Sequence, residues 1–192
     1  MLEELIRRNR SYRRFHQNVP ISDDTLRELV GLARLTPSGG NRQPLKYVLS
    51  SRTSSNALIF RHLAWAAYLK SWPGPAEGER PTAYIILLGD QTLASSFEYD
   101  AGIAAQSILL GAVEKGLGGC LIESVNRKGL RTALALPEHL EILLVMALGQ
   151  PAEEVVIEPL GADGNFEYWR DRKGTHHVPK RSLDELILMQ LT

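Results

Sequence analysis

Cysteine is nearly absent from this sequence, and neither sign of charge is in excess. The single cysteine, Cys120, cannot form a disulfide within one chain, so the fold must rest on a packed core. The 22 basic and 22 acidic residues leave a formal net charge of zero, whereas nucleic-acid-binding domains usually carry a basic excess. We therefore expect no nucleic-acid partner. Hydrophobic residues make up 44% of the 192 residues, which is enough for one domain with its own core.

Long apolar runs are also missing. The longest, at residues 85–88 and 142–148, are far shorter than the roughly 20 residues that a membrane-spanning helix needs. The first 15 residues contain neither the apolar core nor the small-residue cleavage site of a secretory signal. Together with the single cysteine, these absences predict a soluble, cytoplasmic protein that has no membrane partner.

Several common motifs are lacking as well. No Gly-Lys-Ser or Gly-Lys-Thr follows the loop at residues 37–44, and the glycines at 116–119 precede a strand, whereas those of a dinucleotide fingerprint follow one. His176 and His177 are adjacent and lack further ligands at metal-binding spacing, so no metal site is expected. Cys120 is expected to be buried and unreactive. Acyl transfer by its thiol stays open as an alternative.

The chain does contain clear helical and strand patterns. Segments with helical character, one of them after the N-cap candidate Ser22, are residues 2–10, 22–36, 127–136 and 182–188. Short apolar runs that predict strands are residues 46–50, 83–88, 120–125 and 142–148. The segment 91–115 mixes small and apolar residues, which predicts a long helix buried on all sides.

The segment from residue 151 to residue 177 shows no periodicity of either kind. A structureless stretch of this length is unusual inside a compact domain. We therefore expect an extended arm, at about residues 151–181, that packs on a second copy of the chain.

Three polar clusters point to an anionic ligand. Five arginines fall within residues 7–14, and Arg10 and Arg13 would share one face of a helix, where a guanidinium fork suits phosphate. The loop at 37–44 contains two glycines that allow close backbone approach to a ligand. Lys180 and Arg181 precede the last helix, whose N-terminus also favours anions. Each cluster alone is also typical of a solvated surface, but together they predict a two-sided phosphate clamp.

These clusters belong to stretches that, in this order, resemble the nitroreductase family of flavoproteins. The stretches are RNRSYRRF, TPSGGNRQPLKY, DAGIAAQSILLGAVEKGLGG, ALGQPAE and HHVPKRSLDELI. The resemblance spans nearly the whole chain and is greatest to short members of the family. Asn9, Arg42 and Leu45 depart from the family pattern, and these departures concern substrate fit more than flavin binding.

The resemblance implies a single nitroreductase-like α+β domain over residues 1–192, with a central, mostly antiparallel sheet flanked by helices. It also implies a homodimer that exchanges the C-terminal arm and binds FMN at its interface. One chain is expected to supply Arg10, Ser11, Arg13, Leu121, Ile122, Glu123, Lys180 and Arg181. The other is expected to supply Pro37, Ser38, Gly39, Asn41 and Gln43.

The implied activity is that of an NAD(P)H-dependent FMN oxidoreductase. NADH or NADPH and a small oxidised acceptor (a nitroaromatic, a quinone or a flavin) would use the same flavin face in turn, in a ping-pong cycle. The flavin carries the chemistry, no catalytic protein residue is required, and Arg13 is expected to give electrostatic support at the N1–C2=O edge. A flavin-binding sensor or carrier, or another flavin reaction such as reductive dehalogenation or enoate reduction, stays open.

Acceptor choice is expected to involve an aromatic stripe before Pro73. Trp65, Tyr68, Leu69 and Trp72 occur at helix-like spacing. A stripe of this kind is typical of core packing, and a cover over the flavin is the functional alternative.

Overall fold

The computed structural model describes residues 1–191, and its centre is a four-stranded antiparallel sheet in the order β1–β2–β4–β3. The strands are β1 (Leu45–Ser50), β2 (Ala83–Asp90), β3 (Gly118–Ile122) and β4 (Leu140–Gly149). Each strand overlaps the apolar run that predicted it, so the expected central antiparallel sheet is confirmed.

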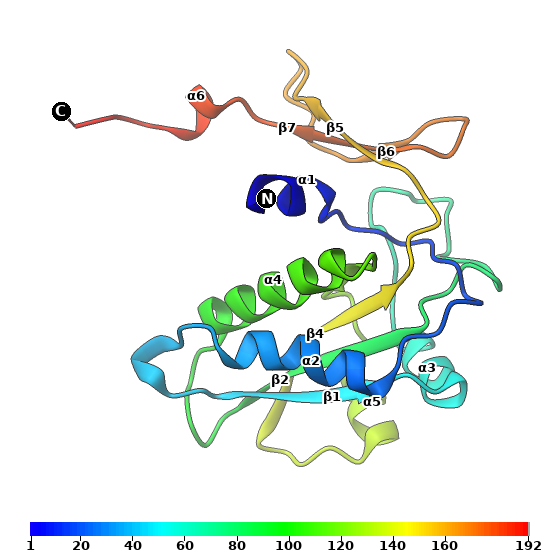
Figure 1. Cartoon of the computed structure of the whole chain (residues 1–192), viewed down its shortest axis with the longest axis vertical. Helices are drawn as coiled ribbons and strands as arrows, with labels where there is room; N and C mark the ends of the chain where they lie inside the picture. Colours follow the sequence, from blue (N-terminus) through cyan, green and yellow to red (C-terminus); the bar gives the residue numbers. More distant parts are fainter. Residues whose placement is uncertain (192) are drawn as a thin grey trace.

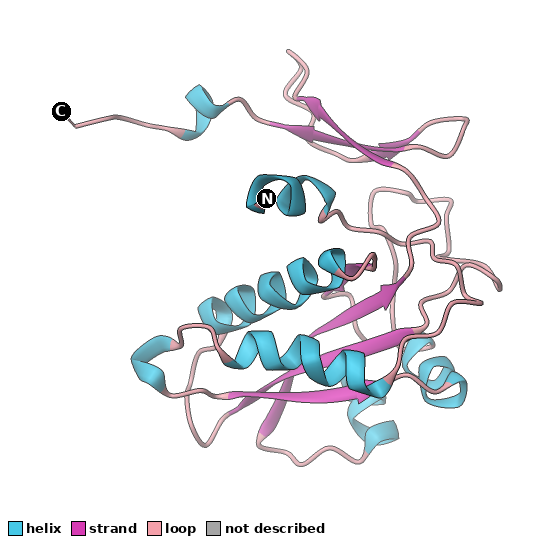
Figure 2. Cartoon of the chain, in the orientation of Figure 1, coloured by secondary structure: helices cyan, strands magenta, loops and turns pink. Residues whose placement is uncertain are grey.

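Helices cover both faces of this sheet, as Figures 1 and 2 show. The α-helices of residues 1–191 are α1 (Leu2–Arg8), α2 (Asp23–Arg34), α3 (Thr53–Phe60), α4 (Glu98–Glu114), α5 (Arg127–Leu134) and α6 (Leu183–Leu186). One face carries α2 and α4, and the other carries α3 and α5. None of these helices has both the length and the apolar character needed to cross a membrane.

The strands are buried on both sides because helices pack against both faces. Along β2, Ile85 and Leu87 contribute to the core under α2 and α4, whereas Tyr84, Ile86 and Leu88 contribute to the opposite core under α3 and α5. A strand buried in this way needs apolar residues at every position. This is why the strands were recognisable in the sequence as continuous apolar runs.

Helix α4 is not buried on all sides, so that part of the prediction is wrong. Ala104, Ala105 and Ala112 are buried, but Tyr99 and Ile103 are 87% and 41% exposed. The helix lies over one face of the sheet with α2 beside it, and the side of α4 that carries Tyr99 and Ile103 faces away from both. A single chain therefore covers one side of this helix and leaves the other side exposed.

The arm, predicted to be extended, contains regular structure that its lack of periodicity did not reveal. It contains the strands β5 (Val155–Pro159), β6 (Trp169–Arg170) and β7 (His176–Lys180), which form a small sheet in the order β5–β7–β6. These strands are short and pair across many residues, so no local pattern revealed them. Figure 1 shows the small sheet beyond α1, with α6 and the chain end projecting away from the rest.

The aromatic stripe at residues 65–72 is not helical, although its spacing resembles that of a helix. It consists of turns, in which the Leu69 amide donates to the Ala66 carbonyl and the Trp72 amide donates to the Leu69 carbonyl, both at 2.8 Å. Successive three-residue turns produce the spacing that resembles a helix. Trp65 is 9% exposed and belongs to the core under α3 and α5.

We expect Gly89→Ala to destabilise the fold. A Cβ atom at Gly89 would lie 2.7 Å from the ring of Phe97, which is buried at the start of α4 and cannot move aside easily. The free energy of unfolding, measured with urea, should fall by about 1–3 kcal/mol. Gly31→Ala is the control, because a Cβ there meets nothing within 4 Å. That substitution in α2 should raise the free energy of unfolding by roughly 0.5–1 kcal/mol, and equal effects of the two would contradict the close contact.

Candidate functional site

The arginine-rich segment after α1 lines a cavity of about 320 Å³, which we call the arginine cavity. Its walls come from this segment, from α4 and β3, and from the arm, three parts that lie far apart in the sequence. The lining residues are Asn9, Arg10, Ser11, Arg13, Gln106, Leu109, Gly119, Leu121, Tyr168, His176, Val178 and Lys180.

Positive charge dominates this cavity. Arg10, Arg13 and Lys180 line it, and none of the described lining residues is acidic. One Arg10 nitrogen, Nη2, donates to the Ile6 carbonyl at 2.8 Å, whereas its Nε is buried without a partner in residues 1–191. Burial lowers the pKa of Arg10 from its ordinary value, but a guanidinium stays charged in proteins. The cavity therefore offers charge and free donors to an anion.

Arg13 is held in one position by groups from two parts of the chain. Its side chain is 8% exposed, and its Nη1 lies 3.1 Å from both the Ser11 carbonyl oxygen and the His176 Nε2. The ring of Tyr168 lies over the guanidinium, 4.6 Å from ring centre to Cζ, a distance at which a cation is attracted to an aromatic face. The arm thus contributes two of the three groups that hold Arg13.

A buried carboxylate, that of Glu153, fixes the arm to the N-terminal segment. It accepts hydrogen bonds from the backbone amides of Arg13 and Arg14 and from Arg170 Nη2, the last at 2.9 Å. The Glu153 side chain is 1% exposed, so all three bonds form away from water. Charge-assisted bonds of this kind are about twice as strong as neutral ones. They make this junction one of the firmest contacts of the arm.

The two adjacent histidines, His176 and His177, lie in different environments. His176 is buried beside Arg13, while His177 lies 2.9 Å from Glu158 through Nδ1 and stacks on Trp169. Successive residues of a strand point to opposite sides, so the pair cannot bind one ion. Among the described residues, no group of three or more His, Cys, Asp or Glu side chains is arranged to hold a metal.

His176 is uncharged at neutral pH. Burial, followed by the positive charges of Arg13, Arg170 and His177, lowers its pKa from 6.5 to about 4. The geometry leads to the same conclusion, because an arginine N–H can only donate and Nε2 must therefore carry a lone pair. A neutral His176 is the acceptor that Arg13 requires.

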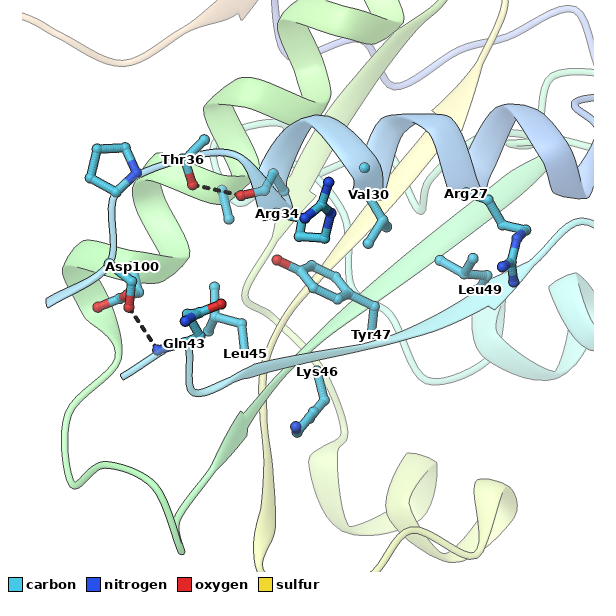
Figure 3. Close-up of a pocket in the computed structure, with 15 residues that line it drawn as sticks. Arg27, Val30, Arg34, Thr36, Gln43, Leu45, Lys46, Tyr47, Leu49 and Asp100 are labelled. Carbon is cyan, nitrogen blue, oxygen red and sulfur yellow. Dashed lines mark hydrogen bonds between the residues drawn. The ribbon is translucent and has the colours of Figure 1, made fainter. Parts of the chain in front are cut away.

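The glycine-containing loop lies at a second cavity, of about 590 Å³, between α2 and β1. Pro37, Ser38 and Gln43 line this α2–β1 cavity, and Figure 3 shows Tyr47 of β1 pointing into it toward α2. The Ser38 hydroxyl accepts a hydrogen bond from the Gln43 amide at 2.9 Å. Asn41 and Gln43 have φ angles of 53° and 50°, a conformation that costs energy for residues other than glycine.

One chain does not bring the two predicted halves of the site together. The amide of Gly39 lies 3.3 Å from the carboxylate of Asp100, at the start of α4. Asp100 and Ala104 of α4 line the α2–β1 cavity, whereas Gln106 and Leu109 of the same helix line the arginine cavity. With about 3.6 residues per turn, these two pairs lie on opposite sides of the helix, so α4 lies between the loop and the arginine cavity.

The remaining predicted residues are not all in the arginine cavity. Leu121 lines it, but the next residue, Ile122, points to the opposite side of β3 and is 5% exposed in the core under α3 and α5. Glu123 lines a separate hollow beside His62. Arg181 is exposed, with Nη1 3.4 Å from Glu185. Strand alternation and the turn after β3 account for the first two placements.

Sequence reasoning missed Glu153, Tyr168 and His176 as site residues. His176 was considered only as a metal ligand beside His177, and the other two lie in the arm, where no periodicity was visible. Their positions depend on the pairing of β7 with β5 and β6, which brings residues near 155, 170 and 176 together. No local signal contains that pairing.

The aromatic stripe divides between core and cavity rim. Trp65 is core, whereas the ring of Tyr68 lies 4.9 Å from that of Tyr168 and 6.3 Å from that of Phe166. Tyr68 and Phe166 are 40% and 61% exposed, so they form an aromatic edge beside the arginine cavity. Trp72 packs under the guanidinium of Arg170 at 4.7 Å.

Cys120 is buried, as predicted, and its burial raises the pKa of the thiol. A thiol nucleophile requires the thiolate form and access to substrate. Both conditions are opposed at this position, which argues against the acyl-transfer alternative.

Comparisons with known proteins agree on one family. Residues 6–150 match a sequence model of the Nitroreductase family. An Archaeoglobus fulgidus protein with the provisional name NADH dehydrogenase/NAD(P)H nitroreductase is 27% identical over an alignment of 155 residues that covers 73% of this chain and 80% of the relative. The 5,6-dimethylbenzimidazole synthase of Rhodospirillum rubrum is 24% identical over 203 residues, covering 94% and 93%. The fold matches an FMN-dependent nitroreductase from Clostridium difficile R20291 with a TM-score of 0.64 at 20% identity, covering 78% and 87% of the two chains.

We expect His176 to make the fold less stable in mild acid. In the unfolded chain a histidine titrates at its ordinary pKa of about 6.5, whereas folded His176 stays neutral down to about pH 4. Between these values the unfolded chain binds one proton more than the folded chain, so lowering the pH favours unfolding. The free energy of unfolding should fall by about 1–2 kcal/mol between about pH 7 and about pH 5.

Urea denaturation across this interval measures the effect. His176→Gln cannot titrate, so it should remove most of the slope between about pH 7 and about pH 5. A slope that is the same in the wild-type chain and the variant would show that other groups cause it.

Proposed function

The chain belongs to the nitroreductase family, and from this premise we propose that it is an FMN-dependent oxidoreductase that transfers electrons from NAD(P)H to a small oxidised acceptor. The observation that carries the proposal is the arginine cavity, where three cations line a hollow without an opposing carboxylate among its described lining residues. The names of the Archaeoglobus and Clostridium proteins support NAD(P)H and FMN respectively.

The residues of the cavity fit FMN. Arg10 and Lys180, which both line the cavity, would hold its phosphate. Ser11 would contact the ribityl chain and Arg13 the pyrimidine edge. The apolar Leu121 would lie against the ring.

Three residues implied by the family resemblance do not line the cavity with their side chains and would bind FMN in other ways. Arg181 would bind the phosphate only after it breaks its ion pair with Glu185. Ile122 and Glu123 would contribute through the backbone of the β3 end, since their side chains point elsewhere.

FMN, when bound, supplies the redox chemistry. The chain supplies orientation and charge: Arg13, fixed by its contacts, places a positive charge where negative charge grows during reduction, and it does so without rearrangement. The donor and the acceptor are proposed to occupy the same place in turn, which is a ping-pong order. The single cysteine, buried and unpaired, supports a reducing compartment such as the cytoplasm.

We propose that the active protein is a homodimer. The loop with Pro37, Ser38, Gly39, Asn41 and Gln43 lies across α4 from the arginine cavity of its own chain, and the loop of a second chain is proposed to complete that cavity. The exposed strip of α4 offers a surface for such a partner.

The chain end also supports a dimer. Leu183, Leu186, Leu188 and Leu191 are between 66% and 93% exposed on a segment that projects from the molecule (Figure 1). Four exposed leucines on one short segment are unusual for a free chain. The arm is proposed to carry this segment onto the partner.

The acceptor is proposed to be flat and aromatic or quinonoid, such as a nitroaromatic, a quinone or a flavin. Tyr68 and Phe166 offer exposed ring edges beside the cavity, and such rings favour stacking with planar ligands. The Rhodospirillum relative carries the name of a synthase. A different flavin reaction, or a flavin carrier without turnover, is therefore the second candidate.

The first test is the visible spectrum and its response to NAD(P)H. We expect the purified chain to hold about one FMN per chain, to bleach with NADH or NADPH and to recover its colour with a quinone. A colourless protein that takes up no added FMN would overturn the proposal. A coloured protein that NAD(P)H does not bleach would favour the carrier.

The same assay on Arg13→Ala tests the assignment of the cation. FMN affinity should fall by at least about tenfold, and bleaching should slow, because a charge-assisted contact is lost. Arg7→Ala is the matched control, since Arg7 is exposed and pairs with Glu3. Unchanged affinity and rate in Arg13→Ala would remove Arg13 from the site.

Truncation after Arg181 tests the dimer. Loss of the exposed leucines should weaken dimerisation by at least about a hundredfold, since each buried leucine contributes roughly 1.5–3 kcal/mol. Light scattering at several concentrations measures the effect. Leu93→Ser is the control, because Leu93 is 43% exposed but lies in the turn after β2. A truncated chain that remains as dimeric as the full chain would contradict the proposal.

A further inference from the structure

Arg13 uses only part of its hydrogen-bonding capacity within the chain. Its Nη1 is occupied by the Ser11 carbonyl and by His176. Its Nε and Nη2 have no acceptor in residues 1–191, yet neither atom is among the buried unpartnered ones, so both are open to the arginine cavity that Arg13 lines. The edge formed by Nε and Nη2 is therefore the one that a ligand can reach.

That edge carries two parallel N–H donors. Two such donors match two neighbouring acceptor atoms on a planar group. The N1–C2=O edge of a flavin offers an acceptor pair of this kind. If rotation about the side-chain bonds of Arg13 reoriented the guanidinium, this match would be lost, because the two N–H donors would no longer point at the two acceptor atoms.

His176 is one of the groups that contact the guanidinium and oppose such rotation. Its side chain is 1% exposed, and Nε2 lies 3.1 Å from Nη1. Because Nε2 must accept, the ring proton lies on Nδ1, which is buried without a partner in residues 1–191. A buried donor without an acceptor costs about 1–3 kcal/mol. The unpaired Nδ1–H of His176 therefore destabilises the fold, while the Nε2 of the same ring supplies an acceptor to Arg13.

Resting on the FMN site proposed above, we propose that His176 is a positioning residue: its neutral Nε2 fixes Nη1 of Arg13 so that the Nε–Nη2 edge faces the cavity and binds the pyrimidine edge of FMN. Tyr168 completes the arrangement by covering the guanidinium face and by lying 5.1 Å from the His176 ring. The arm thereby orients a side chain of the N-terminal segment, and His176 itself makes no contact with the reacting atoms.

Four versions of the full chain test this role: wild type, His176→Gln, His176→Leu and His177→Leu. Glutamine places an amide oxygen near the position of Nε2 and can accept from Arg13, whereas leucine fills similar space and cannot. His177→Leu is the same change on the neighbouring residue, whose ring contacts Glu158 and Trp169 and not Arg13. FMN affinity of the apoprotein and the midpoint potential of the bound flavin are measured for each.

We expect His176→Leu to bind oxidised FMN about tenfold more weakly. Because Arg13 faces the edge where negative charge grows, the reduced flavin should lose about tenfold more affinity than the oxidised flavin, which lowers the midpoint potential by about 30 mV for a two-electron couple. His176→Gln should stay within about twofold of wild type, and His177→Leu should do the same. Wild-type values in His176→Leu would overturn the inference. Equal losses in His176→Leu and His176→Gln would show a packing role and would overturn it as well.

The outcome for the wild-type chain separates the two proposals. If it binds no FMN, the proposed function fails and this inference fails with it. If it binds FMN and only the variant pattern differs from expectation, the inference alone fails.

Nitrogen-15 NMR of the wild-type protein decides the question without a substitution, should His176→Leu not fold. The spectrum should show His176 neutral, with the proton on Nδ1 and none on Nε2, both with and without FMN. A proton on Nε2 would overturn the inference, because Arg13 could not then donate to it.

Discussion

The buried carboxylate of Glu153 is the contact on which the candidate site depends. It binds the backbone amides of Arg13 and Arg14 on one side and the guanidinium of Arg170 on the other, so it joins the N-terminal segment to the arm. This junction holds the small sheet of the arm beside the arginine segment, together with the contacts that His176 and Tyr168 make with Arg13. The walls of the cavity, the orientation of Arg13 and the burial of His176 depend on this placement of the arm.

The position of Glu153 also explains why the arginine cavity keeps its positive charge. Arg10, Arg13 and Lys180 line the cavity, and the acidic group nearest in the hydrogen-bond network, Glu153, contacts the backbone of the segment and so lies behind the cavity wall. The charge that faces the cavity therefore stays uncompensated by the lining, which suits an anionic ligand. His176 fits this field only as a neutral ring, since burial and the surrounding arginines oppose its protonation.

The central sheet and the helices beside it could be predicted because their signals are local. A strand covered by helices on both faces needs an unbroken apolar run, and Ser22 caps α2 through its own hydroxyl, 3.1 Å from the Thr25 amide. Arg10, Ser11, Arg13, Leu121 and Lys180 line one cavity, and their role in binding FMN stays a prediction. Turn spacing in the aromatic stripe imitated a helix, since the two patterns share a repeat of about three residues.

The α+β class, the strand positions and the basic character of the N-terminal segment can be read from the amino-acid sequence, because each depends on residues that are neighbours in the chain. Folding is needed to show that His176 faces Arg13, that Ile122 points into the core, and that α4 lies between the loop at Gly39 and the arginine cavity. These facts depend on strand pairing and on which side of a helix each cavity lies. Such long-range relations have no local pattern, so they exist only once the chain is folded.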